Sequence, residues 1–218
     1  RVLDVAVANF GTHNVGLFLG TGNGSFVSMK IFPTGAARPH WLAVGEFNGD
    51  GHLDIAVSSD GTDDIGILLG DGSGGFSRWT TYSTGFDSAP DSMALGDIND
   101  DNHTDIMVAN YGTSDISLFL GYGNGTFGSQ PSIVLEVNCH PESLVIEDLN
   151  NDGLLDIVVA CTKAYFIGIL LGQSDSTFKS VKKLSTGSDS WPSALLTGKF
   201  DSDNETDIIV ANYETGML

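Results

Sequence analysis

The chain has 218 residues, of which 28 are acidic and 9 are basic, so its formal net charge is −19 at pH 7. This length is enough for one domain with a sizeable core, and the charge disfavours nucleic acid and anionic membranes as partners. No apolar run approaches the roughly 20 residues of a membrane span, and no signal-peptide core is present at the N-terminus. We therefore expect a protein that does not insert into membranes. Because the chain starts without Met and in mid-pattern, we also expect a mature or excised piece of a longer protein.

Taken in order, the sequence repeats itself every 50 or 51 residues. A run of Asp followed by apolar residues begins at Asp4 and returns at positions 54, 105, 156 and 207, and prolines at 39, 90, 141 and 192 keep the same step. A repeat of roughly 40–50 residues suits a propeller blade of four strands. We therefore expect an all-β fold, a β-propeller or propeller segment, in a single repeat domain over 1–218. Its units are a partial first repeat 1–38, repeats 39–89, 90–140 and 141–191, and a partial last repeat 192–218.

The third copy shows how one repeat divides into strands. Alternating small and apolar residues predict an inner strand A over 92–96, and apolar runs predict strand B over 106–110 and strand C over 116–120. A glycine-rich hairpin that ends in Phe127 leads to a fourth strand D near 132–137. Strands B and C are nearly all apolar, as expected for sheets that are covered on both faces.

An acidic loop joins strands A and B of each repeat. The best-formed copy, 148–156, has oxygen-bearing side chains at positions one, three, five and nine and a glycine, Gly153, at the sixth. Calcium prefers six to eight oxygen ligands, and a chain supplies them by coiling tightly around a residue that tolerates positive φ. An EF-hand is excluded because a strand follows and the twelfth residue is Val159 rather than glutamate.

Half of the acidic residues lie in four such windows, 46–54, 97–105, 148–156 and 199–207. Clustered carboxylates repel one another and need a counter-ion, so we expect Ca²⁺ in three loops. In the fourth loop, either the Lys199 ammonium replaces the metal or it swings away and a weaker site survives. A backbone carbonyl supplies the ligand at position seven, and water or a bidentate aspartate completes each shell. The predicted ligands are Glu46, Asn48, Asp50, His52 and Asp54; Asp97, Asn99, Asp101, His103 and Asp105; Asp148, Asn150, Asp152, Leu154 and Asp156; and, in the weaker loop where Lys199 occupies position one, Asp201, Asp203, Glu205 and Asp207.

The histidines do not predict a zinc site. His52 and His103 occupy the backbone-ligand position of their loops, where the side chain points away from the cation. The other three, His13, His40 and His140, lack the spacing of zinc ligands, so we interpret them as ordinary loop residues.

The pattern from Glu46 to Val57, followed by Ile67 to Phe76, resembles the FG-GAP/VCBS repeat of integrin α-subunit propellers and many secreted proteins. The resemblance covers essentially the whole chain, and its motif, D-x-[DN]-x-D-G-x-x-D between two strands, is specific when repeated in register. It implies a propeller with calcium in the A–B loops of one face, and frequent use in adhesion and in carbohydrate or protein binding.

The opposite face should collect the B–C and D–A turns. Aromatic residues recur there and could stack on sugars or anchor a protein, although their spacing equally fits packing between blades; they are Phe10, Trp41, Phe86, Tyr111, Trp191 and Tyr213. Four glycosylation sequons occur. Asn23 and Asn124 lie in exposed turns, whereas Asn102 and Asn204 lie at the bends of acidic loops and are weaker candidates.

Cys139 and Cys161 are the two cysteines, and either a disulfide or two free thiols is open. If the strands around the 148–156 loop pair about its centre, Ser143 faces Cys161 and Cys139 lies farther out.

These patterns favour a calcium-binding, non-catalytic, extracellular or cell-surface module for adhesion, structure or lectin-like binding. Its partners would be a protein or a carbohydrate, and its terminal strands would allow head-to-tail assembly of copies. The alternative is the propeller domain of a secreted polysaccharide-active enzyme that uses acids such as Asp87, Asp91 and Glu142. The sequence contains no nucleophile elbow, catalytic triad or phosphate loop in support of an enzyme.

Overall fold

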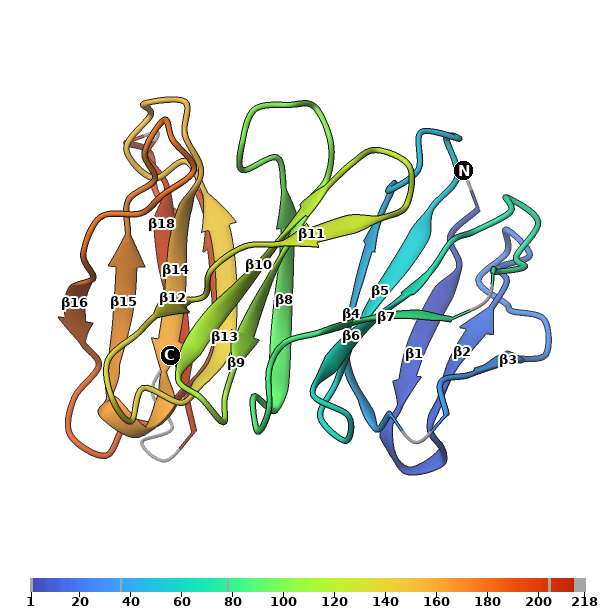
Figure 1. Cartoon of the computed structure of the whole chain (residues 1–218), viewed down its shortest axis with the longest axis horizontal. Coiled ribbons are helices and arrows are strands. Elements are labelled where there is room, and N and C mark those ends of the chain that lie inside the picture. The colour runs from blue at the N-terminus through green and yellow to red at the C-terminus, as the bar shows by residue number, and fades with distance from the viewer. Residues whose placement is uncertain (1, 36, 78, 204, 214–218) are drawn as a thin grey trace.

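The computed structural model describes residues 2–35, 37–77, 79–203 and 205–213, and its regular elements are β-strands apart from two short 3-10 turns (Figure 1). The described strands form five antiparallel sheets, here called blades 1 to 5 in chain order. Together they make a β-propeller fold, as the repeat predicted. Among the described residues no helix is long and apolar enough to cross a bilayer.

Blades 2 to 4 each contain the four expected strands or more, paired in chain order. Blade 1 consists of β1 (Val5–Asn9), β2 (Asn14–Phe18) and β3 (Lys30–Pro33). Blade 2 consists of β4 (Pro39–Gly45), β5 (Asp54–Ser59), β6 (Asp64–Leu68) and β7 (Thr80–Ser83). Blade 3 consists of β8 (Pro90–Gly96), β9 (Asp105–Asn110), β10 (Asp115–Gly121), β11 (Phe127–Ser129) and β12 (Ile133–Val134). Blade 4 consists of β13 (Pro141–Glu147), β14 (Asp156–Cys161), β15 (Phe166–Leu170) and β16 (Lys182–Ser185), and blade 5 of β17 (Pro192–Gly198) and β18 (Asp207–Asn212).

Neighbouring blades pack face to face through their second and third strands. Every residue of β5, β9 and β14 is buried, because each of these strands has another blade or strand on both sides. One core cluster joins blades 2 and 3 around Ile67 and Phe119, and another joins blades 3 and 4 around Met107 and Ile157. Burying each such side chain contributes roughly 1.5–3 kcal/mol.

The inner strands β4, β8, β13 and β17 lie next to one another across the blades. The acidic loops follow their C-terminal ends, at the upper edge of Figure 1, and the repeated prolines begin them at the lower edge. The two sets of loops therefore lie on opposite faces of the molecule, as the alternation of turns predicted.

Each proline is preceded by a residue with left-handed backbone. Arg38, Ala89, His140 and Trp191 have φ of 48°, 43°, 46° and 48°, a region that non-glycine residues seldom adopt. In blades 2 to 4 a hydrogen bond to the B–C turn of the previous blade holds this conformation. The amide of Ala89 donates to Asp63 Oδ1 at 2.9 Å, and the amide of His140 donates to Ser114 Oγ at 3.1 Å. We call this arrangement the interblade joint.

The cysteines form a disulfide, with both residues buried in blade 4 and Cα atoms 4.3 Å apart. The predicted register around it is wrong. The strands pair Glu147 with Asp156 and Ser143 with Ala160, one residue off the predicted register, and a bulge between Pro141 and Ser143 shifts it by one more, so Pro141 lies opposite Cys161. The bulge brings Cys139 within reach of Cys161.

The outer strand of blade 3 also differs from the expected strand over 132–137. It consists of two short pieces, β11 and β12, which pair with the two ends of β10. Pro131 lies between them, and a proline has no amide hydrogen to donate to the ladder. The strand is therefore interrupted directly before residue 132, its predicted start.

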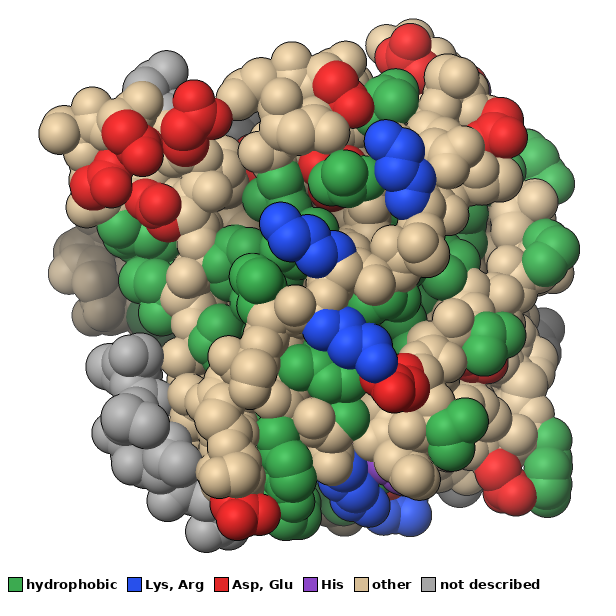
Figure 2. Space-filling model, turned by 90° about the vertical axis from the view of Figure 1, so that its left-hand side faces the viewer, with side chains coloured by type: hydrophobic (Ala, Val, Ile, Leu, Met, Phe, Trp, Pro, Cys, Tyr) green, Lys and Arg blue, Asp and Glu red, His purple; other side chains and the backbone are tan. Residues whose placement is uncertain are grey.

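The outer edge of blade 4 carries lysines. Lys182 and Lys183 of β16 are exposed, as is Lys179 before it, and Figure 2 shows basic side chains over this side and acidic ones gathered at a corner. Lys183 pairs with Glu136 and lies over the ring of Phe166. Charged side chains on an edge strand discourage pairing with another chain, so these lysines protect the open edge.

Candidate functional site

The acidic loops have the coil that a cation loop requires. In each of the three best-formed loops, the residues at positions four and six have positive φ, and they are Gly49 and Gly51, Asp100 and Asn102, and Asn151 and Gly153. Asn102 has φ of 64° and Gly153 has φ of 85°. Both residues predicted to form the bend of their loops therefore do so, and the three loops repeat one backbone path.

Carboxylates at positions one and five turn into the loop. Asp148 accepts the amide hydrogens of Asp152 at 3.1 Å and Gly153 at 2.8 Å, and Asp152 Oδ1 accepts that of Leu154 at 2.9 Å. Asn150 Nδ2 donates to Asp152 Oδ2 at 3.0 Å, which brings positions three and five together. The loops at 46–54 and 97–105 repeat the last two contacts with nearly the same lengths.

The aspartate at position nine has a different role in this structure. Asp54 is fully buried, and its two oxygens accept the amide hydrogens of Phe47 and Gly70, each at 2.7 Å. Asp105 and Asp156 make the equivalent pairs of bonds. Burial raises the pKa of Asp54 and of Asp105, and the neighbouring loop carboxylates raise it further. Position nine thus ties the loop to strand C, and its service as a cation ligand stays a prediction.

The residues present fit a hard cation in their chemistry, since each loop gathers carboxylate and amide oxygens on a tight coil. Within the described ranges, however, no group of three His, Cys, Asp or Glu side chains is arranged to hold a metal ion. The predicted shell relies on an asparagine and a backbone carbonyl at two of its positions, and the buried aspartate faces backbone amides.

The fourth loop keeps some contacts of the other three but differs in its neighbours and in the burial of its last aspartate. Asp201 accepts the amide hydrogen of Asp203, and Asp203 that of Glu205, at 2.9 Å each. Glu205 accepts a hydrogen bond from Asn151 Nδ2 of blade 4 at 3.1 Å, so the two loops touch. Asp207 is less buried than its three equivalents. The sequon residue Asn204 lies outside the described residues.

The loop histidines pack against glycines of the next hairpin. A side chain added at Gly72 would lie 2.5 Å from the His52 ring, and one added at Gly123 would lie 2.4 Å from the His103 ring. These contacts explain why the hairpins carry glycine there. Both rings are therefore engaged with the C–D hairpins.

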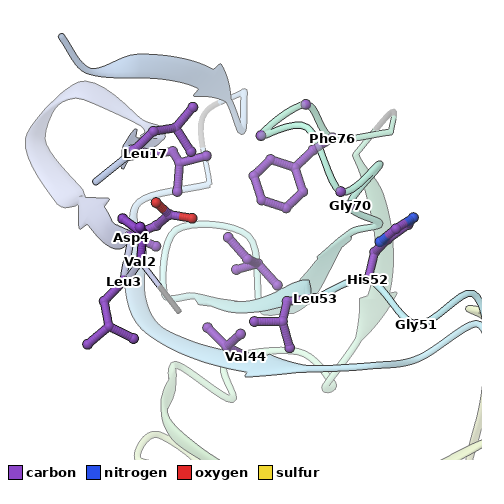
Figure 3. A pocket seen from close by; sticks show the side chains of 16 residues that line it. Val2, Leu3, Asp4, Leu17, Val44, Gly51, His52, Leu53, Gly70 and Phe76 are labelled. Atoms are coloured by element: carbon purple, nitrogen blue, oxygen red, sulfur yellow. The ribbon is translucent and has the colours of Figure 1, made fainter. Parts of the chain in front are cut away.

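A pocket of about 500 Å³ lies between blades 1 and 2 (Figure 3). Its walls are mainly apolar and include Leu17, Val44, Leu53 and Phe76. Blade 1 has no described strand in the position that β4 and β8 hold in their blades, so the pocket lies where an inner strand would pack.

The structure brings some of the aromatic candidates into pairs on the face opposite the acidic loops. The ring of Tyr111 lies 4.8 Å from the ring of His140, and Lys163 Nζ lies 5.1 Å from the centre of the Tyr111 ring. Trp191 lies 6.0 Å from Tyr165, and Phe10 lies under Arg38. These three bridge neighbouring blades.

Trp41, Phe86 and Tyr213 are more open to solvent, at 45%, 87% and 77% exposure. His40 was interpreted as an ordinary loop residue, but its Nδ1 lies 2.7 Å from Asp91 Oδ1. The sequence feature that could have indicated this pair is the position after each repeated proline, where the residue type differs from blade to blade. Of the three acids considered for catalysis, Asp91 lies close enough for its charge to raise the pKa of Glu142, whereas Asp87 donates its amide hydrogen to Asp63.

The sequons at Asn23 and Asn124 lie in exposed hairpins. Thr126 donates its hydroxyl hydrogen to Asn124 Oδ1 at 2.6 Å, and Thr21 does the same to Asn23 Oδ1. Asn102 is also exposed but holds a loop bend. Their glycosylation remains a prediction.

The sequence model of the FG-GAP-like repeat matches the chain four times, at residues 2–57, 47–108, 97–159 and 148–210. A search of the curated proteins by sequence finds no match. Solved structures share the fold at low identity. A protein from Lactobacillus plantarum aligns with a TM-score of 0.71 at 14% identity, over 97% of this chain and 61% of its own.

Two further structures differ in what they do. A periplasmic gluconolactonase of Pseudomonas aeruginosa aligns with a TM-score of 0.68 at 13% identity, over 95% of this chain and 53% of its own. A biofilm matrix protein of V. cholerae aligns with a TM-score of 0.55 at 20% identity, over 96% of this chain and 31% of its own. The chain thus spans less than two thirds of the length of these structures, which show its fold and not its activity.

Proposed function

Because the chain belongs to the FG-GAP-like repeat family, we propose that it is a calcium-stabilised, non-catalytic binding module that acts outside the cell. The observation that carries the proposal is the threefold repetition of one acidic coil, with left-handed residues at the same two positions and a position-five carboxylate that accepts the amide hydrogen of position seven. Three loops would bind Ca²⁺, and the loop with Lys199 would bind it more weakly.

The donor types favour Ca²⁺ over Mg²⁺. The loops offer carboxylate, amide and carbonyl oxygens from a flexible coil, which suits the six to eight ligands and variable geometry of calcium. Magnesium demands a near-ideal octahedron and keeps several waters. A bound cation would also relieve the repulsion that clustered carboxylates impose on the buried aspartates.

An extracellular location is supported by the disulfide between Cys139 and Cys161, since such bonds persist in oxidising compartments. The exposed sequon hairpins agree with a glycoprotein. Adhesion or lectin-like binding would use the face opposite the acidic loops, where Trp41 and Phe86 are exposed. Head-to-tail assembly through terminal strands stays a prediction.

The alternative, a propeller domain of a secreted polysaccharide-active enzyme, draws on Asp91 and Glu142. Burial raises the pKa of Glu142, as a general acid requires, and His40 lies beside Asp91. We prefer the binding module because the calcium loops recur in three blades, whereas this acid–base group occurs once.

Calorimetric titration with Ca²⁺ and thermal melts with and without chelator test the proposal. We expect binding at three sites or more and a lower melting temperature in chelator, because a ligand at 100 times its Kd adds about 2.7 kcal/mol per site. Equal melting curves with and without chelator, together with no heat of binding, would refute the calcium proposal.

A further inference from the structure

The start of each inner strand places one side chain on the face opposite the acidic loops. The left-handed residue and the proline of the interblade joint are followed by a β-bulge in blades 2 to 5. Bulges re-aim the side chains that they contain. The backbone device is the same in every copy, but the residue after the proline is His40, Asp91, Glu142 or Ser193. Constant geometry with changing chemistry indicates that these side chains do not serve the fold alone.

Two of these side chains are joined across blades 2 and 3. His40 Nδ1 lies 2.7 Å from Asp91 Oδ1, and the side chains are 47% and 18% exposed. The hydrogen bond to Asp91 raises the pKa of His40, although partial burial opposes it. A carboxylate that holds Nδ1 fixes the orientation of the ring and leaves Nε2, on its other side, to meet a ligand.

The third side chain comes from blade 4. Glu142 is half-buried, and this burial is the largest cause of its raised pKa. The charge of Asp91 raises the pKa further, whereas the charges of His40 and Lys163 lower it. Asp91, His40 and Lys163 therefore each lie within electrostatic reach of Glu142. Within the described residues, the Glu142 carboxylate makes no hydrogen bond or ion pair. Its oxygens are not among the fully buried unpartnered atoms, so the carboxylate is open to solvent and to a ligand.

An exposed aromatic residue stands next to this group in the sequence. Trp41 follows His40 within the same bulge and is 45% exposed. Its amide donates to Ser58 Oγ at 2.9 Å, and Ser58 Oγ donates in turn to the carbonyl oxygen of Asp91 at 2.7 Å. A single buried hydroxyl thus fixes the backbones that carry Trp41 and Asp91 relative to each other.

The geometry points to a carbohydrate-binding site formed by Trp41, His40, Asp91 and Glu142. The inference rests on the proposed function, in which this face carries the ligand, and it names the ligand class and the polar contacts. Carboxylates accept hydrogens from neighbouring sugar hydroxyls, an imidazole both donates and accepts, and an indole face packs on the apolar side of a sugar ring.

Other ligand classes fit the group less well. An anion would meet two carboxylates on a chain of net charge −19. A cationic ligand would meet His40 and Lys163, and the described residues hold no three-membered metal-binding group. A neutral, hydroxyl-rich chain uses donors and acceptors together without a net charge.

Affinity gel electrophoresis in calcium, with dextran, mannan, laminarin or xylan cast into the gel, tests the site. We expect at least one polysaccharide to retard the protein, and His40→Ala, Glu142→Gln and Trp41→Ala each to weaken retardation about tenfold or more. Ser193→Ala is the matched control, because Ser193 holds the equivalent bulge in blade 5 and should leave retardation unchanged. Melting curves in calcium show whether each variant is folded.

The outcomes separate the two proposals. No retardation of the wild-type protein by any of the four polysaccharides, or equal loss in Ser193→Ala and His40→Ala, would overturn the sugar site. New reducing ends that depend on Glu142 would replace it with the enzyme alternative. If chelator leaves the melt unchanged while the His40 variant loses retardation, calcium binding fails and the sugar site stands.

Discussion

Asp105 Oδ1 accepts the amide hydrogen of Gly121 at 2.8 Å, and this bond ties an acidic loop to the end of strand C. The other oxygen of Asp105 accepts the amide hydrogen of Ile98 at 2.8 Å, so the buried carboxylate closes the loop on both sides. A Cβ at Gly121 would lie 2.3 Å from the carbonyl oxygen of Thr104, which explains the glycine at this position in blades 1 to 4. The aspartate and the glycine are therefore one structural unit in each blade.

Replacing Asp105 with Ala should destabilise the protein even in chelator. Two buried amides would lose their acceptor, and the expected loss is roughly 2–4 kcal/mol in the free energy of unfolding. Urea denaturation in chelator measures the loss without any contribution from a bound cation. Asp100→Asn is the control, because Asp100 is exposed and asparagine tolerates its φ of 57°. Similar losses in both variants would mean that the buried hydrogen bonds are not the cause.

Replacing Asp152 with Ala should remove one calcium site and leave the others. Asp152 is the position-five carboxylate of the best-formed loop, and its oxygens face the loop interior. Calorimetry should show one binding event fewer, and the melting temperature in calcium should fall more than in chelator. Asp175→Ala removes an equal charge from a hairpin outside the loops and should keep the full number of sites. An unchanged stoichiometry in Asp152→Ala would contradict the assignment of this loop.

A second disulfide should form at Ala37 and Ser59 after both are changed to Cys. These residues occupy in blade 2 the positions that Cys139 and Cys161 hold in blade 4, with the same separation of 22 residues, and both are buried. The oxidised variant should gain roughly 2–4 kcal/mol. Reductant also breaks the native bond between Cys139 and Cys161, so a fall in melting temperature on reduction no larger than that of the wild type would show that the new bond fails to form.

The His40–Asp91 pair should make stability depend on pH. Hydrogen bonding to Asp91 raises the folded-state pKa of His40 above 6.5. Burial lowers this pKa, the charge of Asp60 raises it, and Glu142 is a further charged group within reach of His40. A raised histidine pKa means that the folded state binds the proton more tightly. The added stability is therefore complete below pH 6.5 and disappears as the pH rises through the folded value.

Urea melts between about pH 5.5 and 8.5 in the wild type and in Asp91→Asn measure this dependence, because that range brackets the ordinary pKa of a histidine side chain and the values above it. The variant should show a flatter decline above pH 6.5, because asparagine cannot stabilise the imidazolium as a carboxylate does. Parallel curves for the two proteins would exclude the pair as the source.

The fold follows from the sequence to the extent that the repeat controls it. The step of 50 or 51 residues predicted the blades, and Asn102 and Gly153 were identified as the bends of their loops because few residues tolerate positive φ. The bulge at Pro141 was not foreseen, since nothing in the local sequence shows that one strand carries an extra residue. The register at Cys161 was misplaced by two positions, one because the strands pair Glu147 with Asp156 and one because of this bulge.

The His40–Asp91 contact was missed for a different reason. The two residues are equivalent positions of adjacent blades, so they meet only through the packing of inner strands, and their unlike side chains hide the equivalence. A comparison of the repeats position by position, with attention to where they disagree, would have found it. The split outer strand, in contrast, could have been read from Pro131.

The interblade joints make the angle between neighbouring blades a local property. A left-handed residue and a proline set how each blade leaves the last, with a hydrogen bond to the preceding turn in blades 2 to 4, and none of these contacts reaches beyond two adjacent blades. A unit of one repeat could be added or removed between equivalent prolines without altering any remaining joint. Variation in array length is thus open to this architecture by duplication or loss of whole units, with the geometry of each retained blade unchanged.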